Sequence, residues 1–338
     1  MINRSSSRVF AFILMMGVAQ PAFGAMKQIR AAYFPNVTHA PALIARATRH
    51  FESRLGEDVT IQWKTFNAGP EAIEALFAGA IDILYVGPSP AINGYVRSQG
   101  DALQIVAGVA SGGAGFVVRE DSGIESFEDI KGKRVATPQK GNTQDVALRH
   151  LMKEKGLVSK DQGGDVEIFH ISGGDQITAF LKGQIDAIWT VEPWLTRLTS
   201  EANGKILFEE GELWPEAKYA TTVLVVRKKF MQEHPDLVTS WLKAHVEIVD
   251  WINGNYSKAK QLFNEEFEHE TGKFLPSGYL DRFFARISFT AEPMESELFQ
   301  AADQAYAVGY LGKQKPDFSG LYELSFLKDA LSEKEKKI

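Results

Sequence analysis

The sequence predicts an α/β protein built from two lobes of like topology, and three observations support this. A block of six residues returns 104 positions later without drift, as Gly69, Ile73, Ala75, Gly79, Ile81, Asp82 and then Gly173, Ile177, Ala179, Gly183, Ile185, Asp186. Each copy is typical of an amphipathic helix that ends at a glycine and returns into an apolar strand. Strands and helices alternate at a spacing that favours parallel strands with helical crossovers.

The elements of the first lobe begin at Gln28. The patterns predict strands over 28–33, 59–66 and 81–86 and helices over 40–55 and 70–78, followed by a helix that enters at Gly87-Pro88-Ser89-Pro90 and runs through Val96. Two short β-rich runs, 103–110 and 115–119, flank Ser111-Gly112-Gly113-Ala114. We expect the chain to cross between the lobes there.

The second lobe follows, and the chain then returns to the first. Ser126 begins an N-cap pattern, and strands are expected over 133–137, at Val166-x-Ile168, over 185–191 and, returning to the first lobe, over 221–227. After Pro235 one apolar helix face is predicted: Leu237, Trp241, Ala244, Ile248, Trp251, Ile252. We therefore expect a first lobe made of 26–112 and 220–338, with C-terminal helices, and a second lobe made of 113–219.

Residues 1–25 resemble a targeting segment. Arg4 and Arg8 form a basic start, 9–19 are an apolar run too short to cross a bilayer, and small residues at 22–25 suit cleavage. We expect a cleaved signal peptide and a periplasmic protein, the alternative being a retained membrane anchor. The chain has no Cys, which a mature chain of this size does not need in order to bury two cores.

Charge and motifs exclude several classes of function. The formal net charge is −6, and it becomes −8 without Arg4 and Arg8, which argues against nucleic acid or an anionic membrane as partner but not against a small anion. The seven histidines lack zinc spacing, and there is no nucleophile elbow or phosphate-binding loop. We expect a monomer that is not an enzyme, with no catalytic residues, metal or cofactor.

Three loops that follow predicted strands are candidates for a ligand site: 33–39, 87–90 and 137–143. Ligands of open parallel sheets bind outside the carboxyl ends of the strands, and a helix N-terminus there offers unpaired N–H groups to an anion. Opposed across a cleft, such ends would clamp an oxyanion without lysine. The alternative is that Thr38, Ser89 and Asn142 only cap their helices.

Two charged residues lie near these loops. Glu192 follows a predicted strand and precedes Pro193, so its carboxylate could enter the cleft, or it could cap the next helix or pair with Arg197. Arg119 could hold an anionic head group or be a solvated strand end. Five aromatic residues either form an apolar wall for a ligand tail or belong to cores: Tyr33, Phe34, Tyr85, Trp189, Trp214.

Four segments resemble the periplasmic substrate-binding proteins of ABC transporters in the nitrate, taurine and aliphatic sulfonate family: 33–43, 78–90, 126–137 and 185–194. The resemblance spans nearly all of the chain after the targeting segment. It implies a type II periplasmic binding protein: two Rossmann-like lobes joined by two crossovers, with a ligand cleft between them.

The resemblance also implies ligand contacts, to which the loop analysis adds Thr38. The expected ligand-binding residues are Phe34, Asn36, Thr38, Gly87, Ser89, Gly113, Thr137, Asn142, Thr143 and Glu192. The implied function is capture of a small anion (sulfonate, taurine or nitrate-like) by lobe closure, for a cognate ABC permease of the inner membrane. Two alternatives stay open: an enzyme on the same fold acting on a pyrimidine precursor, and a ligand-sensing partner of a membrane receptor.

Overall fold

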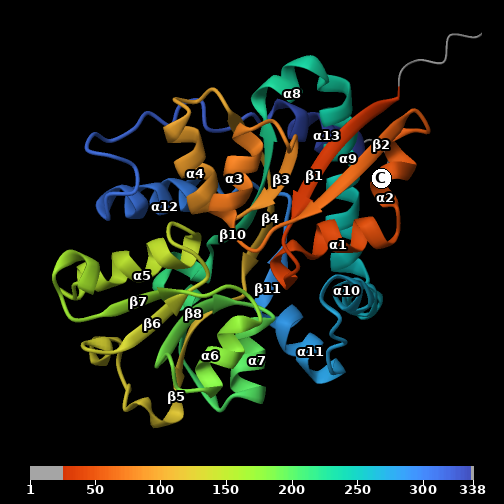
Figure 1. Cartoon of the computed structure of the whole chain (residues 1–338). Helices are drawn as coiled ribbons and strands as arrows, with labels where there is room; N and C mark the ends of the chain where they lie inside the picture. Colours follow the sequence, from red (N-terminus) through yellow and green to blue (C-terminus); the bar gives the residue numbers. More distant parts are fainter. Residues whose placement is uncertain (1–25, 336–338) are drawn as a thin grey trace, which may run out of the picture.

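The computed structural model describes residues 26–335, and the chain folds there into two α/β lobes, each around its own sheet (Figure 1). The predicted signal peptide lies outside the described residues. The first sheet has six strands, in the order β11-β4-β10-β3-β1-β2, and the second has five, in the order β7-β6-β8-β5-β9. The strands are β1 Lys27–Tyr33, β2 Val59–Thr65, β3 Ile83–Val86, β4 Leu103–Gly112, β5 Ala114–Arg119, β6 Arg134–Thr137, β7 Glu167–His170, β8 Ala187–Val191, β9 Gly204–Glu209, β10 Ala220–Arg227 and β11 Ile287–Phe289.

The two sheets repeat one topology, which confirms the prediction of two similar α/β lobes. In each, three parallel strands lie side by side, β2-β1-β3 in the first lobe and β7-β6-β8 in the second. An antiparallel strand pairs with the third of these, and it is the strand that arrives from the other lobe: β10 in the first lobe and β5 in the second. The chain therefore crosses between the sheets twice, once between β4 and β5 and once before β10.

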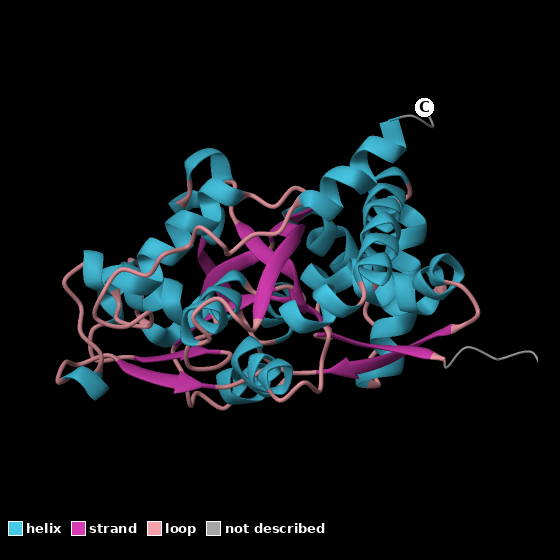
Figure 2. Ribbon diagram, turned by 90° about the horizontal axis from the view of Figure 1, so that it is seen from above, coloured by secondary structure: helices cyan, strands magenta, loops and turns pink. Residues whose placement is uncertain are grey.

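Helices flank the central strands (Figure 2), and most of the helices belong to the first lobe. They are α1 Ala40–Ala47, α2 His50–Leu55, α3 Gly69–Phe77, α4 Pro88–Arg97, α5 Thr143–Glu154, α6 Asp175–Leu181, α7 Trp194–Glu201, α8 Lys228–Glu233, α9 Pro235–Gly254, α10 Tyr256–Thr271, α11 Ser277–Arg286, α12 Glu295–Ala307 and α13 Ser325–Glu335. Short 3-10 turns are η1 Val37–His39, η2 Glu120–Ser122, η3 Phe127–Ile130, η4 Lys160–Gln162, η5 Glu210–Leu213 and η6 Pro215–Ala217.

The predicted helix 40–55 is two helices, because the chain turns at Arg49. Arg49 has a left-handed backbone conformation (φ 52°), which ends α1 and redirects α2. Phe51 of α2 then reaches the core, where its ring stacks on Trp241 at 3.9 Å between centroids. If the chain continued α1 as one straight helix, the apolar residues of α2 would not face the same core as those of α1.

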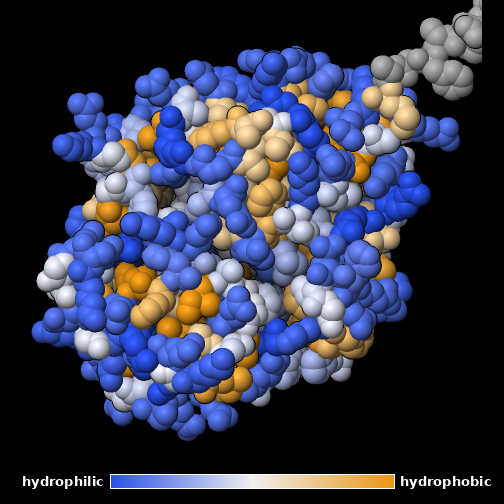
Figure 3. All heavy atoms as spheres, viewed as in Figure 1, coloured by the Kyte–Doolittle hydropathy of each residue, from blue (hydrophilic) through white to orange (hydrophobic). Residues whose placement is uncertain are grey.

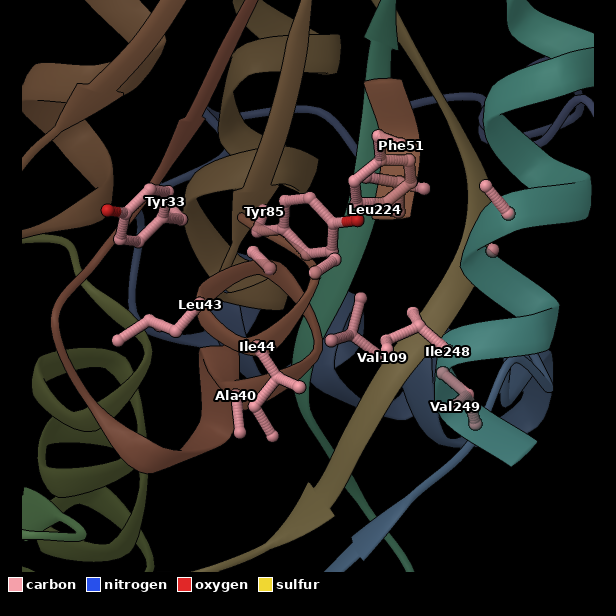
Figure 4. Packing of buried hydrophobic residues seen from close by; sticks show 14 of the residues in the cluster. Tyr33, Ala40, Leu43, Ile44, Phe51, Tyr85, Val109, Leu224, Ile248 and Val249 are labelled. Carbon is pink, nitrogen blue, oxygen red and sulfur yellow. The ribbon is translucent and has the colours of Figure 1, made fainter. Parts of the chain in front are cut away.

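Apolar side chains fill both faces of the first sheet. Figure 4 shows part of this core: Tyr33 and Tyr85 from the strands lie near Leu43 and Ile44 of α1, and Ile248 of α9 lies beside Val109 of β4. Five of the six positions of the predicted apolar helix face are buried, namely Leu237, Trp241, Ala244, Ile248 and Ile252, whereas Trp251 is only partly buried.

Outside the cores the surface is mainly polar. Figure 3 shows hydrophilic residues over most of one face, with hydrophobic residues in small groups. Between residues 26 and 335, no helix combines the length and the apolar character that crossing a membrane requires.

The lobes contact each other on both sides of the space between the sheets. Near the crossover, Arg286 of the first lobe donates to Glu192 of the second (Nη1 to Oε1, 3.0 Å), and the Val37 amide donates to the Glu192 carbonyl at 3.3 Å. Farther away, the Tyr310 hydroxyl donates to Asp145 of α5, and Lys153 Nζ donates to the Ala307 carbonyl at 2.6 Å. These contacts hold the two lobes against each other in this structure.

Candidate functional site

A cavity lies between the lobes at the carboxyl ends of all six parallel strands. Its volume is about 60 Å³. Every loop that follows β1, β2, β3, β6, β7 or β8 contributes to its wall, together with the start of β10. The lining residues are Phe34, Asn36, Thr38, His39, Asn67, Ala68, Gly69, Gly87, Pro90, Pro138, Asn142, Thr143, Gln144, Gly173, Val191, Trp194 and Thr221.

Several helices begin at this wall. Gly69, Thr143 and Trp194 are the first residues of α3, α5 and α7, and Gly87 is the N-cap of α4. The first N–H groups of a helix have no acceptor within that helix, and the helix dipole makes this end positive. N-termini from both lobes therefore face one small space, which is the arrangement that stabilises an anion without a cationic side chain.

The absence of a side chain at Gly87 lets the two lobes approach across the cavity. A Cβ atom at Gly87 would lie 2.4 Å from Oγ1 of Thr143 in the opposite lobe. Gly87 has an ordinary backbone conformation (φ −64°), so glycine is needed here for space rather than for its backbone freedom. The Thr143 hydroxyl is buried and has no hydrogen-bond partner among the described residues, so it is available to a ligand.

Internal hydrogen bonds engage the side-chain oxygens of three of the four lining amides. Asn36 Oδ1 accepts from the Thr38 hydroxyl at 2.9 Å, and Asn142 Oδ1 accepts from the Asp145 amide at 3.0 Å. Asn142 Nδ2 in turn donates to Gln144 Oε1 at 2.8 Å. The amide nitrogens of Asn36 and Gln144 have no acceptor among the described residues, so they are available to donate to a ligand.

His39 adds one more neutral donor. Its Nδ1 accepts from the Phe34 amide at 3.2 Å, so the proton of the neutral ring is on Nε2. Burial lowers the pKa of His39 to about 3, which keeps the imidazole uncharged at neutral pH. The ring packs against Phe34 with 4.5 Å between centroids. Among the described residues, the lining contains no Lys, Arg, Asp or Glu.

Six of the ten predicted ligand-binding residues line the cavity: Phe34, Asn36, Thr38, Gly87, Asn142 and Thr143. The other four, Ser89, Gly113, Thr137 and Glu192, do not. Ser89 is buried in the first turn of α4, and the Gly113 carbonyl accepts from the Glu192 amide at 2.9 Å. Thr137 is fully buried and donates its hydroxyl to Asp145 at 3.3 Å.

Glu192 is fully buried, and its carboxylate points away from the cavity. It accepts from the amide and the hydroxyl of Thr196 at 2.9 and 2.8 Å, and from Arg286 at 3.0 Å. Burial raises the pKa of Glu192, against the effect of these donors. Of the roles considered from the sequence, this placement favours the cap of the following helix over entry into the cleft; the ion-pair partner is Arg286, not Arg197.

Asp145 organises the loop before α5. It accepts from the Gly141 amide at 2.8 Å, from Arg149 at 3.3 Å and from Tyr310 of the first lobe, and its Oδ1 lies 3.3 Å from Nε2 of His170. Burial alone would raise the pKa of Asp145, but His170 and the charge of Arg149 outweigh it and hold that pKa below its usual value. This carboxylate fixes the loop that carries Asn142 and Thr143.

Five polar or aromatic lining residues were missing from the predicted set: His39, Asn67, Gln144, Trp194 and Thr221. His39, Gln144 and Trp194 adjoin or belong to segments already singled out, so a wider reading of those segments would have found them. Asn67 lies after β2, and Thr221 is the second residue of β10. No sequence motif marks either residue. Of the five predicted aromatic candidates, Tyr33, Tyr85 and Trp189 are fully buried in the cores, Trp214 stacks on Tyr219, and Phe34 reaches the cavity.

A family model and two relatives match the chain over much of its length. The model of the NMT1-like family matches residues 24–264. A putative aliphatic sulfonates-binding protein of Bacillus subtilis (strain 168) is 27% identical over 318 residues, which are 91% of this chain and 89% of that protein. The taurine-binding periplasmic protein of Escherichia coli (strain K12) is 28% identical over 207 residues, 61% of each chain.

Solved structures share the fold. The alkanesulfonate-binding protein SsuA of Xanthomonas axonopodis pv. citri, bound to MOPS, has a TM-score of 0.72 at 23% identity and covers 87% of this chain and 97% of its own. The desulfurization enzyme DSZB has a TM-score of 0.65 at 15% identity over 91% of this chain and 99% of its own. The fold is thus that of the periplasmic binding proteins, and it also supports an enzyme, so function must be argued from the site.

Proposed function

The chain belongs to the NMT1-like family, and from this premise we propose that it is the solute-binding protein of an ABC importer that captures a small oxyanion. The two relatives with binding-protein names support the class of protein, and their named ligands are sulfonates and taurine. We propose a nitrate-like or sulfonate-like anion as ligand. The proposed location is the periplasm, with residues 1–25 removed as a signal peptide.

One observation carries this proposal: the cavity is lined by helix N-termini and neutral donors from both lobes. Amides of the first turns, the hydroxyl of Thr143, the amide nitrogens of Asn36 and Gln144, and the imidazole of His39 all suit an oxygen with negative charge. In a site that excludes water such oriented dipoles act strongly, and they need no compensating cation.

The same arrangement supports capture by closure. Asn36, His39 and Gly87 belong to the first lobe, whereas Asn142, Thr143 and Gln144 belong to the second. An anion contacts both sets only when the lobes are together, so its binding free energy favours the closed form. We propose that the protein acts as a monomer and that the permease recognises this closed form.

Thermal unfolding and calorimetry with a ligand panel test the proposal. Ethanesulfonate, taurine, nitrate, a phosphonate and a pyrimidine are added in turn, and at least one of the oxyanions is expected to raise the melting temperature by mass action. The double variant Asn142→Ala, Thr143→Ala should weaken that oxyanion by about tenfold or more, because it removes a hydroxyl and the cap of α5.

The matched control is Ser277→Ala. Ser277 is also the first residue of a helix, α11, but it is exposed and does not line the cavity. The control should bind as the wild type does. If the double variant folds and keeps full affinity, the site is misplaced. If no oxyanion binds at millimolar concentration, or if the pyrimidine alone binds, the proposed function fails.

A further inference from the structure

The distribution of donors and acceptors narrows the ligand class. Resting on the proposed function, we propose that this site accepts oxyanions without an ammonium group and discriminates against aminated analogues such as taurine. The inference concerns the part of the ligand that is not the oxyanion. It follows from three features of the cavity. Most side-chain amide oxygens in the wall already accept a hydrogen bond, no carboxylate is part of the wall, and the positive ends of helix dipoles face it.

Three of the four lining side-chain amides, and the acceptor nitrogen of His39, already accept hydrogen bonds from protein groups. Asn36 Oδ1, Asn142 Oδ1 and Gln144 Oε1 each accept a hydrogen bond from a neighbouring protein group, at 2.9, 3.0 and 2.8 Å. The Nδ1 lone pair of His39 is bonded to the Phe34 amide. An ammonium group has three protons to donate, and in this wall it would find only neutral acceptors, most of which already accept a hydrogen bond.

Four carboxylates lie next to the lining loops. Asp175 is exposed at the start of α6 and is not part of the cavity wall, and each of the other three is bound to neighbouring protein groups. Glu71 accepts from the amides of Asn67 and Ala68 at 2.7 and 3.3 Å, which caps α3. Asp145 accepts from Arg149 and Tyr310, and Glu192 from Thr196 and Arg286. All three are absent from the cavity wall. No carboxylate of the described residues is therefore placed to pair with a buried ammonium.

The helix dipoles at the wall disfavour a cation. The N-terminal ends of α3, α4, α5 and α7 meet at the wall, and each carries a partial positive charge. Inside the closed cavity an ammonium group exchanges bulk water for the groups of this wall. A charge that loses its water without gaining an acceptor is strongly disfavoured.

Isothermal titration of the wild-type protein with matched sulfonates tests this. Ethanesulfonate, 2-hydroxyethanesulfonate and taurine share the head group and nearly the same size, and they differ in the second substituent. We expect taurine to bind at least about tenfold more weakly than ethanesulfonate, since an unpaired buried charge costs more than the 1.4 kcal/mol that tenfold represents. Taurine binding as tightly as ethanesulfonate, or more tightly, overturns the inference and leaves the proposed function standing. If no oxyanion binds, the proposed function itself fails.

Two variants test which residues set the preference for ethanesulfonate over taurine. Asn36→Asp places a carboxylate in the lining at nearly constant shape, and it should weaken ethanesulfonate while narrowing its advantage over taurine. Glu192→Gln should leave the ratio of the two affinities unchanged, because Glu192 contacts Thr196 and Arg286 instead of the cavity. A selective loss of taurine binding in folded Glu192→Gln would assign the amine to Glu192 and contradict the inference. Should Glu192→Gln fail to fold, the wild-type comparison still decides.

Discussion

The two lobes use the same arginine–aspartate pair at the same place. In the first lobe Arg30 donates to Asp82 through Nε at 2.8 Å, Nη2 at 2.6 Å and its peptide nitrogen at 3.0 Å. In the second lobe Arg134 donates to Asp186 through the same three atoms at 3.0, 2.7 and 2.9 Å. Asp82 and Asp186 belong to the sequence repeat, and Arg30 and Arg134 are separated by the same 104 positions. The correspondence between the lobes therefore includes side-chain geometry as well as topology.

The lobes differ in the arginine at the end of their antiparallel fourth strand, β10 in the first lobe and β5 in the second. Arg227 ends β10 and gives Asp82 a second guanidinium at 2.6 Å, whereas its counterpart Arg119 ends β5 and turns to Asp121 at 2.9 Å. The backbone is the same in both, since the two arginine amides donate to the carbonyls of Asp82 and Asp186. Arg119, considered above for an anionic head group, is thus the structural equivalent of a core-anchoring arginine. The two arginines thus occupy the same backbone position, but their side chains bind different aspartates.

Removing the two aspartates should reveal this difference, and it is the largest effect we expect. Asp82→Ala leaves two guanidinium groups without their shared partner at a site that is 1% exposed, and it should lower the free energy of unfolding by about 3 to 5 kcal/mol. Asp186→Ala affects one arginine at a site that is 11% exposed and should cost about 1 to 3 kcal/mol. Urea titration followed by tryptophan fluorescence measures both.

Asp121→Ala is the control for this comparison, because Asp121 is 77% exposed and its loss should change little. If Asp186→Ala destabilises the protein as much as Asp82→Ala does, the second arginine contributes nothing and the contrast between the lobes is wrong.

A second pair of equivalent residues contacts two buried groups whose pKa values are shifted in opposite directions. Tyr85 and Trp189 occupy equivalent positions of β3 and β8, and each contacts a buried titratable group. The Tyr85 hydroxyl lies 3.4 Å from Nδ1 of His245, and Trp189 Nε1 donates to Glu210 at 2.7 Å. Burial lowers the pKa of His245 to about 4 and raises the pKa of Glu210 to about 7. Burial therefore favours the neutral form of both groups in the folded protein.

The pH dependence of stability should separate the two groups. The folded pKa of Glu210 lies above its unfolded value of 4.5, so its contribution is complete below that pH and is lost as the pH rises to about 7. The folded pKa of His245 lies below 6.5, so its contribution is complete above that pH and is lost as the pH falls toward 4. We expect effects of about 1 to 3 kcal/mol.

Unfolding of Glu210→Gln and His245→Gln across this pH range checks the signs. Relative to the wild type, Glu210→Gln should gain stability as the pH rises from 4.5 to 7, and His245→Gln should gain as the pH falls from 6.5. Two variants whose difference from the wild type follows pH in the same direction would refute the contrast between these sites.

The smallest expected effect concerns the loops after β3 and β8. Gly87-Pro88 and Glu192-Pro193 follow equivalent strands, but Gly87 lines the cavity and Glu192 supports the junction of the lobes. Gly87→Ala should reduce affinity for the proposed oxyanion ligand by about tenfold while leaving unfolding nearly unchanged, since its Cβ would collide with Thr143 only when the lobes meet. Calorimetry measures the affinity, and affinity equal to that of the wild type would mean that closure tolerates the extra methyl group.

Much of the fold was predictable because its signals are local. Helical and strand periodicity predicted the parallel strands of both lobes, and the repeat predicted their common topology. The break at Arg49 was missed, because the apolar pattern of α1 and α2 continues through it while the backbone turns. Part of the cavity wall was predictable as well, since a strand-end loop that carries Gly, Asn or Thr faces the ligand side of a parallel sheet.

The sequence by itself determined that the chain folds as two related α/β lobes with loops of small and polar residues at the strand ends. Only the tertiary structure decided which atoms of those loops face the cavity. Glu192 shows the reason: its partner Arg286 lies 94 residues away, and no local pattern links the two. In the same way Asn36 and Gln144 become donors because neighbours occupy their oxygens. Periodicity reports burial, whereas the direction of a hydrogen bond depends on every group that folding brings within reach.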